Sequence, residues 1–136
     1  MRTGTLLGSL TIPGRPECVR AAREFVASKL GDTCGCADTA VLLTSELVTN
    51  SIIHSGSARN GGTITITLVS IPGGIRAEVI DEGSVTVPSL VHGLGQPDLP
   101  EDGRGLQLVE MLSARWSFWR DEAGLVTWFE LSEPPL

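Results

Sequence analysis

The sequence predicts an α/β protein with about five strands and with helices packed on one face of the sheet. Two kinds of segment predict this class. Some carry apolar residues at three- and four-residue spacing, and others alternate β-branched polar residues with aliphatic ones. A length of 136 residues suits one domain with its own core. Because 41% of the residues are hydrophobic and only 19% are charged, the chain is not of the disordered class. We therefore expect a single domain over residues 1–136.

Charge and hydropathy narrow the function classes. The net charge is −6 and no basic run is present, which argues against a nucleic-acid-binding protein. No apolar run reaches the roughly 18 residues that a membrane-spanning helix needs. The apolar stretch near the N-terminus is too short for a signal peptide and ends at Pro13 and Gly14. The sequence thus predicts a cytoplasmic protein.

The cysteines do not predict a metal site. Cys34 and Cys36 form a C-x-C pair, and Cys18 is the third cysteine of the chain. Three thiols cannot supply the four ligands of a structural zinc site, and no histidine lies at a spacing that would join them. We expect small, partly buried thiols.

In the N-terminal half, one strand is followed by two helices. Residues 4–12 read as a strand that ends at Pro13 and Gly14. A helix is predicted from Pro16 to Gly31, with its apolar face spaced every three or four residues. Asp38 is the expected cap of a long second helix, which runs to about residues 55–56.

In the C-terminal half, a helix lies between two predicted hairpins. Residues 63–69 and 75–80 alternate as strands and are expected to pair as an antiparallel hairpin. Residues 84–102 form a long segment with prolines, glycines and no sustained period, which favours a functional lid. A helix with Leu106, Val109 and Leu112 on one side should follow. Strands are predicted over 114–119 and 125–131.

The long helix carries the first of three polar signals. The stretch from Glu46 to His54 is apolar nearly all round, which predicts a buried helix. Glu46 and Asn50 nevertheless share one stripe, because they lie four residues apart. Taken alone, an ordinary solvated stripe would explain them. A further residue, His54, lies one turn beyond Asn50 and reads more simply as a helix-end histidine.

The other two signals follow in order along the chain. Asp81 and Gly83 form an Asp-x-Gly at the end of a strand, and Gly103-Arg104-Gly105 opens a helix behind the lid. Each is weak alone, since Asp-x-Gly is usually a turn. Together they suit a nucleotide. Amide groups at a helix start hold phosphate, an asparagine oxygen suits Mg²⁺, and a strand-end carboxylate can accept a hydrogen from a base amino group.

The order E-x-x-x-N, D-x-G and G-x-G-L resembles the GHKL ATP-binding superfamily. The stretches from Glu46 to His54 and from Gly103 to Val109 are most similar to the bacterial anti-sigma-factor serine kinases. The resemblance implies a Bergerat-type two-layer sandwich, with a mixed β-sheet, helices on one face and an ATP lid. It also implies ATP and Mg²⁺ as cofactors, with Asn50 as the metal ligand. The implied nucleotide-binding residues are Asn50, Asp81, Gly83, Gly103, Arg104, Gly105 and Leu106.

The sequence departs from the family pattern at two places. Ser84 replaces a second glycine at the lid hinge, which predicts a stiffer hinge. Thr127 falls one place later than the threonine of many relatives, so strand alternation predicts that it faces away from the adenine unless a bulge intervenes. The tryptophans at 116, 119 and 128 favour packing over base stacking.

Two functional classes remain open. In the first, the chain is a serine/threonine protein kinase and anti-sigma factor, with Glu46 as the catalytic base for transfer to a small antagonist protein. In the second, it is a module whose bound ATP controls a partner without phosphotransfer. A gyrase- or Hsp90-type ATPase and a histidine-kinase catalytic domain fit less well. The implied partners are a sigma factor, an antagonist protein or both, and the resemblance allows a homodimer.

Overall fold

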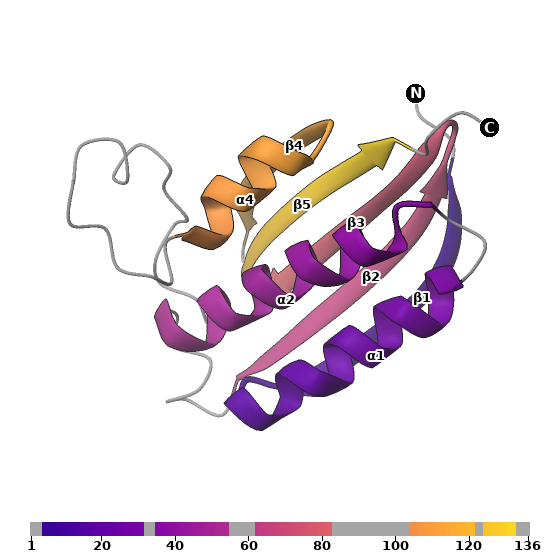
Figure 1. Ribbon diagram of the computed structural model, residues 1–136. Coiled ribbons are helices and arrows are strands. Elements are labelled where there is room, and N and C mark those ends of the chain that lie inside the picture. The colour runs from indigo at the N-terminus through magenta and orange to yellow at the C-terminus, as the bar shows by residue number, and fades with distance from the viewer. Residues whose placement is uncertain (1–3, 32–34, 55–61, 83–103, 122–123, 133–136) are drawn as a thin grey trace.

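The computed structural model describes residues 4–31, 35–54, 62–82, 104–121 and 124–132, and over these ranges it has a sheet layer and a helix layer (Figure 1). The strands are β1 (Thr5–Pro13), β2 (Thr63–Ile71), β3 (Gly74–Asp81), β4 (Arg115–Asp121) and β5 (Gly124–Ser132). The helices are η1 (Pro16–Cys18, a 3-10 turn), α1 (Val19–Leu30), α2 (Ala37–His54) and α4 (Arg104–Leu112). The predicted α/β class, with helices on one face of the sheet, is confirmed. The lid residues 84–102 lie outside the described ranges.

The sheet has the strand order β1-β2-β3-β5-β4. Each of the four neighbouring pairs is antiparallel, so the mixed sheet that the family resemblance implied is wrong for the described strands. For two of these pairs, β2–β3 and β4–β5, the physical reason is the short connection between consecutive strands, because parallel neighbours need a long crossover instead. The predicted hairpin of β2 and β3 is confirmed, with Ile71 opposite Gly74 at its turn.

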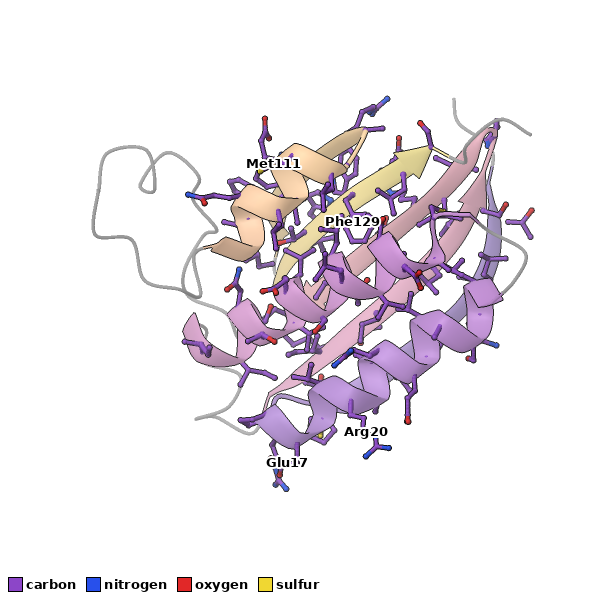
Figure 2. The ribbon with its side chains drawn as sticks, in the orientation of Figure 1. Glu17, Arg20, Met111 and Phe129 are labelled. Carbon is purple, nitrogen blue, oxygen red and sulfur yellow. The ribbon has the colours of Figure 1, made fainter. Side chains whose placement is uncertain are left out.

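The core lies between the helix layer and one face of the sheet. Alternate residues of β2 point to this face, and Ile64, Ile66 and Leu68 are fully buried there. The predicted apolar face of α1 is confirmed, because Ala22, Val26 and Leu30 are buried. Phe129 of β5 is the largest of the fully buried side chains and lies between the two layers (Figure 2). Helical and strand periodicity therefore meet in one apolar layer, as the sequence predicts.

Three expectations about the helices were wrong. The helix α2 begins at Ala37, so Asp38 lies in its first turn and is not its cap. The same helix is not buried all round, because Leu42 is 41% exposed and Ile53 is 51% exposed. On α4, Leu112 is 44% exposed, whereas Leu106 and Val109 are buried as predicted. The exposure of these residues on α2 and α4 has one cause, since a helix lying on a sheet has one side that no described element covers.

The cysteines do not share one state. Cys18 is a partly buried free thiol, as expected. Cys36 is disulfide-bonded, so the expectation of a thiol was wrong for this residue. Cys34 lies outside the described ranges. Among the described helices, none is both long enough and apolar enough to span a membrane.

Candidate nucleotide-binding site

Three elements meet at one end of the molecule. The helix α2 packs against both β3 and α4. Figure 1 shows the C-terminal half of α2, the last residues of β3 and the first residues of α4 at the same end. These are the segments that carry the three polar signals of the sequence. The fold therefore brings Asn50, Asp81 and the start of the helix at Arg104 to one region.

Asn50 lies in the last turns of α2 and has a buried side-chain oxygen. Its side-chain oxygen Oδ1 is buried, and it accepts no hydrogen bond from any described residue. A buried amide oxygen without a partner is costly, because it has lost its hydrogen bonds to water. Glu46 lies one turn earlier on the same stripe and is half-buried. An oxygen atom with unused acceptor capacity is what a cation or a bound water requires.

Asp81 ends β3 as a carboxylate within an apolar row. It is 2% exposed, and its cross-strand neighbours on the two sides are Ile64 and Leu125. Because directly opposite residues of antiparallel strands share a face, its side chain points toward the helix layer. A carboxylate is rarely buried in such a row without a specific role. The burial therefore favours a binding function over the simple turn that an Asp-x-Gly usually marks.

Gly124 lets β5 start directly beside Asp81, a feature that the sequence reasoning missed. Its φ of +148° is one that residues with a side chain rarely adopt. A Cβ atom there would overlap the carbonyl oxygen of Asp81 and would lie 3.0 Å from the Cα of Glu82. The signal in the sequence was a glycine directly before the predicted strand 125–131. Only glycine permits this close approach of the two strands.

Thr127 faces the same side of the sheet as Asp81, which corrects the prediction made from the sequence. Thr127 is opposite Val79, two residues before Asp81, and it is 6% exposed. The continuous register of β3 and β5 shows that no bulge is needed to bring it there. The prediction was made by comparing the position of Thr127 with that of the threonine in relatives. The side of the sheet on which Thr127 faces is decided instead by the register of β5 against β3. Thr127 thus joins the candidate site.

The helix α4 begins at Arg104, as the glycine-rich turn predicted. Leu106 is 8% exposed and packs into the core, which fixes the first turn of the helix against the layer below. At the other end, the indole Nε1 of Trp116 donates a hydrogen bond to Oε2 of Glu110. Gly83 and Gly103 lie outside the described ranges. Both ends of α4 are therefore held in place, and the amide groups at its start have no partner within the helix, as at any helix N-terminus.

The described residues provide one oxygen ligand that suits a Mg²⁺ ion. Among the described residues, no group of three or more His, Cys, Asp or Glu side chains could hold a metal by itself. Mg²⁺ is commonly held by one or two protein oxygens together with substrate phosphates and water. The buried Oδ1 of Asn50 supplies such an oxygen. The site suits an ion that arrives with a nucleotide better than one held by the protein alone.

Comparisons with known proteins agree with this arrangement. The histidine kinase-like ATPase domain family matches residues 12–131. A protein named serine-protein kinase RsbW from Listeria monocytogenes serovar 1/2a is 27% identical in an alignment that covers 84% of this chain and 80% of that protein. The serine-protein kinase RsbW of serotype 4a is 26% identical over the same shares.

A solved structure shares the fold. It contains the RsbU and RsbW domains of a Mycobacterium tuberculosis protein, and it matches 94% of this chain with a TM-score of 0.64 and 20% identity. The present chain spans about a third of that longer chain, since the match covers 33% of it. The family match extends over most of the 136 residues and includes the described site residues Glu46, Asn50 and Asp81. The chain belongs to the histidine kinase-like ATPase domain family.

Proposed function

We propose that the chain is an ATP- and Mg²⁺-dependent protein-serine kinase of the anti-sigma-factor type, which holds a sigma factor and phosphorylates a small antagonist protein in the cytoplasm. The observation that carries the proposal is that Glu46 and Asn50 lie one turn apart on the same stripe of α2. They lie at the end of the molecule where Asp81 is buried. The relatives named serine-protein kinases support the same activity.

Nucleotide recognition is divided among the three elements. Asp81 would accept a hydrogen from the adenine amino group, with Thr127 beside it on the same face of the sheet. Asn50 would hold Mg²⁺, which when bound neutralises part of the phosphate charge. Gly83 would flank the base. The phosphates would lie at the start of α4, lined by Gly103, Arg104, Gly105 and Leu106. Each of these roles follows the chemistry of the residue and the family pattern.

Glu46 is the group suited to proton transfer. In the proposed step, the carboxylate of Glu46 accepts the proton of the substrate serine hydroxyl. The serine oxygen then forms a bond to the γ-phosphorus, and the bond between that phosphorus and the bridging oxygen of ADP breaks. The transition state is loose and little covalent work is required, so position is the main contribution of the protein. The half-burial of Glu46 on the same stripe of α2 as Asn50 supports this role.

A second function uses the same site without phosphotransfer. In this alternative, bound ATP changes how the chain contacts a partner, and the nucleotide is not consumed. The observation that keeps it open is the limited exposure of Glu46, because a half-buried carboxylate can also serve to hold a water or a helix neighbour. The two functions share every nucleotide contact and differ only at Glu46.

The test is transfer of labelled phosphate from ATP to a partner protein recovered by pull-down with Mg-ATP. Glu46→Gln keeps the size of the side chain but removes the base, so we expect the transfer rate to fall by roughly 10²- to 10⁴-fold. The affinity for Mg-ATP should stay within a few-fold of wild type, because Glu46 is not proposed to contact the adenine ring of the nucleotide. If wild-type protein transfers no phosphate while ATP still changes partner binding, the kinase proposal fails and the ATP-controlled binding module stands.

A further inference from the structure

Asp81 lies at the very end of a strand, where a binding side chain is difficult to hold in one position. It is the last residue of β3, and it is buried. The ends of elements open more readily than their middles, because fewer contacts hold them. A side chain that recognises a ligand must keep its position to within about 0.5 Å. Asp81 can therefore select a base only if the backbone directly beyond it is also held.

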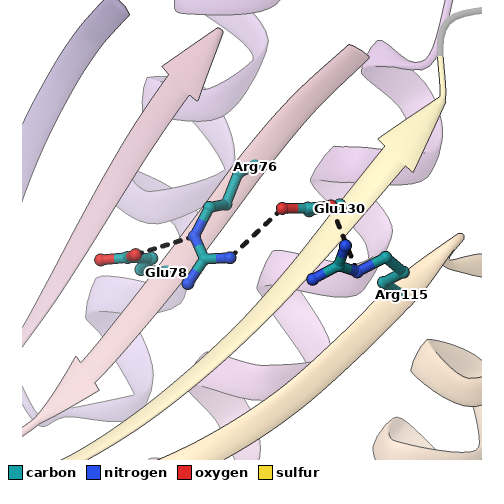
Figure 3. Close-up of polar contacts among 4 residues, drawn as sticks. All are labelled: Arg76, Glu78, Arg115 and Glu130. Atoms are coloured by element: carbon teal, nitrogen blue, oxygen red, sulfur yellow. Dashed lines mark hydrogen bonds and ion pairs between the residues drawn. The ribbon is translucent and has the colours of Figure 1, made fainter. Parts of the chain in front are cut away.

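The middle of β3 is held by ion pairs on the face of the sheet opposite the helices. Arg76 Nε lies 2.9 Å from Glu78 Oε2, and Arg76 Nη1 lies 3.3 Å from Glu130 Oε2 on β5 (Figure 3). The guanidinium carbon of Arg76 also lies 4.0 Å from the centroid of the Trp128 ring, which belongs to β5. These contacts join β3 to β5 before the strand reaches Asp81. They do not by themselves fix its end.

Thr63 and Glu82 extend the pairing of β2 and β3 one step past Asp81. Ile64 is opposite Asp81 in the register, so Thr63 is opposite Glu82. The backbone N–H of Glu82 donates a hydrogen bond to the carbonyl oxygen of Thr63, with 3.1 Å between the two atoms. The hydroxyl of Thr63 donates a second hydrogen bond to Oε2 of Glu82, at 2.9 Å. One backbone bond and one side-chain bond thus close the strand end directly after Asp81.

The Thr63 side of this contact is itself tied to β1. Thr63 is opposite Pro13, the last residue of β1. The N–H of Gly14 donates a hydrogen bond to the carbonyl oxygen of Gly62, the residue directly before Thr63, at 3.1 Å. The start of β2 is therefore held on the side away from β3. Because of this, Glu82 is bonded to a fixed point and not to a second loose strand end.

On the other side of β3, the start of β5 lies against the same backbone. A Cβ atom at Gly124 would overlap the carbonyl oxygen of Asp81 and would lie 3.0 Å from the Cα of Glu82. The backbone of Asp81 and Glu82 thus runs between Thr63 and Gly124. Side chains alternate along a strand, so Glu82 points away from the helix layer that Asp81 faces. The contact with Thr63 therefore leaves the nucleotide side of the sheet unobstructed.

We propose that Thr63 and Glu82 are positioning residues, whose hydrogen bond holds the Asp81 carboxylate where it meets the amino group of adenine. This inference rests on the proposed function, which assigns Asp81 to the base. A hydroxyl that donates to an ionised carboxylate makes a stronger bond than one between neutral groups. The pair is exposed to solvent, so it contributes little to overall stability. Its effect should appear instead in the choice between ATP and GTP.

The test is calorimetric titration of ATP and of GTP, each with Mg²⁺, into the full chain and its variants. Thr63→Val removes the hydroxyl and keeps the β-branched shape that suits a strand, so the variant should fold. Its ATP affinity should fall by roughly two- to tenfold. Its GTP affinity should stay nearly unchanged, because guanine presents a carbonyl oxygen where adenine presents the amino group. The preference for ATP should therefore narrow.

Two further variants show whether the hydroxyl of Thr63 is the cause. Thr63→Ser restores the hydroxyl and should recover the wild-type preference for ATP. Thr65→Val is the matched control, because Thr65 lies on the same face of β2 and its hydroxyl oxygen lies 2.8 Å from that of Thr11 on β1. It should leave both affinities unchanged. A loss in Thr65→Val equal to that in Thr63→Val would contradict a specific role for the contact with Glu82.

A second measurement uses no nucleotide. Amide hydrogen exchange at Glu82, followed by NMR, reports how often the end of β3 opens. Exchange at this amide should be roughly two- to tenfold faster in Thr63→Val than in wild-type protein, and unchanged in Thr65→Val. An unchanged exchange rate in Thr63→Val would overturn the positioning role, whatever the protein does with ATP.

The binding outcomes separate this inference from the proposed function. If wild-type protein prefers ATP and Thr63→Val keeps the full preference, Thr63 and Glu82 do not position Asp81, and the contact of Asp81 with the base stands. Equal losses of ATP and GTP affinity in Thr63→Val would show general damage to the site and would also overturn the inference. If wild-type protein binds both nucleotides equally, the base contact of Asp81 fails, and the positioning role fails with it.

Discussion

At the scale of single residues, the candidate site depends on polar atoms placed where apolar ones would be more stable. The Oδ1 atom of Asn50 is buried and has no hydrogen-bond partner among the described residues. Asp81 lies at the end of a buried apolar row of the sheet. Natural proteins accept such costs mainly at functional sites. Thr127 adds a third polar side chain on the same side of the sheet.

Asp81 should select the base. A carboxylate that accepts a hydrogen from the adenine amino group meets a carbonyl oxygen in guanine, and two acceptors then face each other. Leaving a buried acceptor unpaired costs about 1–3 kcal/mol, so wild-type protein should bind ATP more tightly than GTP. Asp81→Asn offers a donor as well and should narrow this preference. Competition binding with both nucleotides measures it, and equal affinities in wild-type protein would refute the assignment.

Thr127 should contribute to affinity through its hydroxyl. Thr127→Val keeps the shape of the side chain and removes one hydrogen-bonding group, so ATP affinity should fall by roughly two- to tenfold, equivalent to about 0.5–1.5 kcal/mol. Thr67→Val is the matched control, because Thr67 pairs with Glu78 on the opposite face of the sheet. Calorimetric titration compares the two variants. Equal effects at both positions would show that Thr127 has no specific role.

At the scale of elements, most of the secondary structure could be predicted, because each element is encoded by its own local period. The strands and helices lie within a few residues of the expected ranges, and the hairpin of β2 and β3 has the expected partners. The three polar signals were also placed on the expected elements. A strong local pattern is sufficient for such predictions.

What could not be predicted depends on contacts between distant segments. The side on which Thr127 faces is decided by its register against Val79, which lies 48 positions earlier in the chain. The exposure of Leu42 and Leu112 depends on what the fold leaves uncovered, and both residues look like core residues in the sequence. The close approach of Gly124 to Asp81 likewise joins two strands that a local pattern cannot relate.

Gly124 should be essential to both stability and binding. Gly124→Ala adds a Cβ atom that overlaps the backbone of Asp81 at an unfavourable φ, so we expect a loss of more than about 1 kcal/mol in the free energy of unfolding together with weaker ATP binding. Gly31→Ala is the control. Gly31 also has a positive φ, +46°, but a Cβ atom there would have no neighbour within 4 Å. Denaturant unfolding and ATP titration should show that only Gly124→Ala loses affinity. Unchanged affinity in a folded Gly124→Ala variant would contradict the proposed coupling between this glycine and Asp81.

At the scale of the whole molecule, the two faces of the sheet have different chemistry. The face under the helices holds the core and, at one end, the residues of the candidate site. The other face carries ion pairs and tryptophans in an ordered group. The outer side of the helix layer carries exposed apolar residues, among them Met111.

We propose that α2, β3 and α4 together form one site for a magnesium nucleotide. Calorimetric titration of Mg-ATP into wild-type protein and into Asn50→Ala tests it most directly. Wild-type protein should bind one nucleotide per chain. Asn50→Ala should bind at least about tenfold more weakly, a difference of roughly 1.4 kcal/mol, because it removes the oxygen proposed to hold the ion. Absence of binding by wild-type protein, or unchanged affinity in a folded Asn50→Ala variant, would contradict the account.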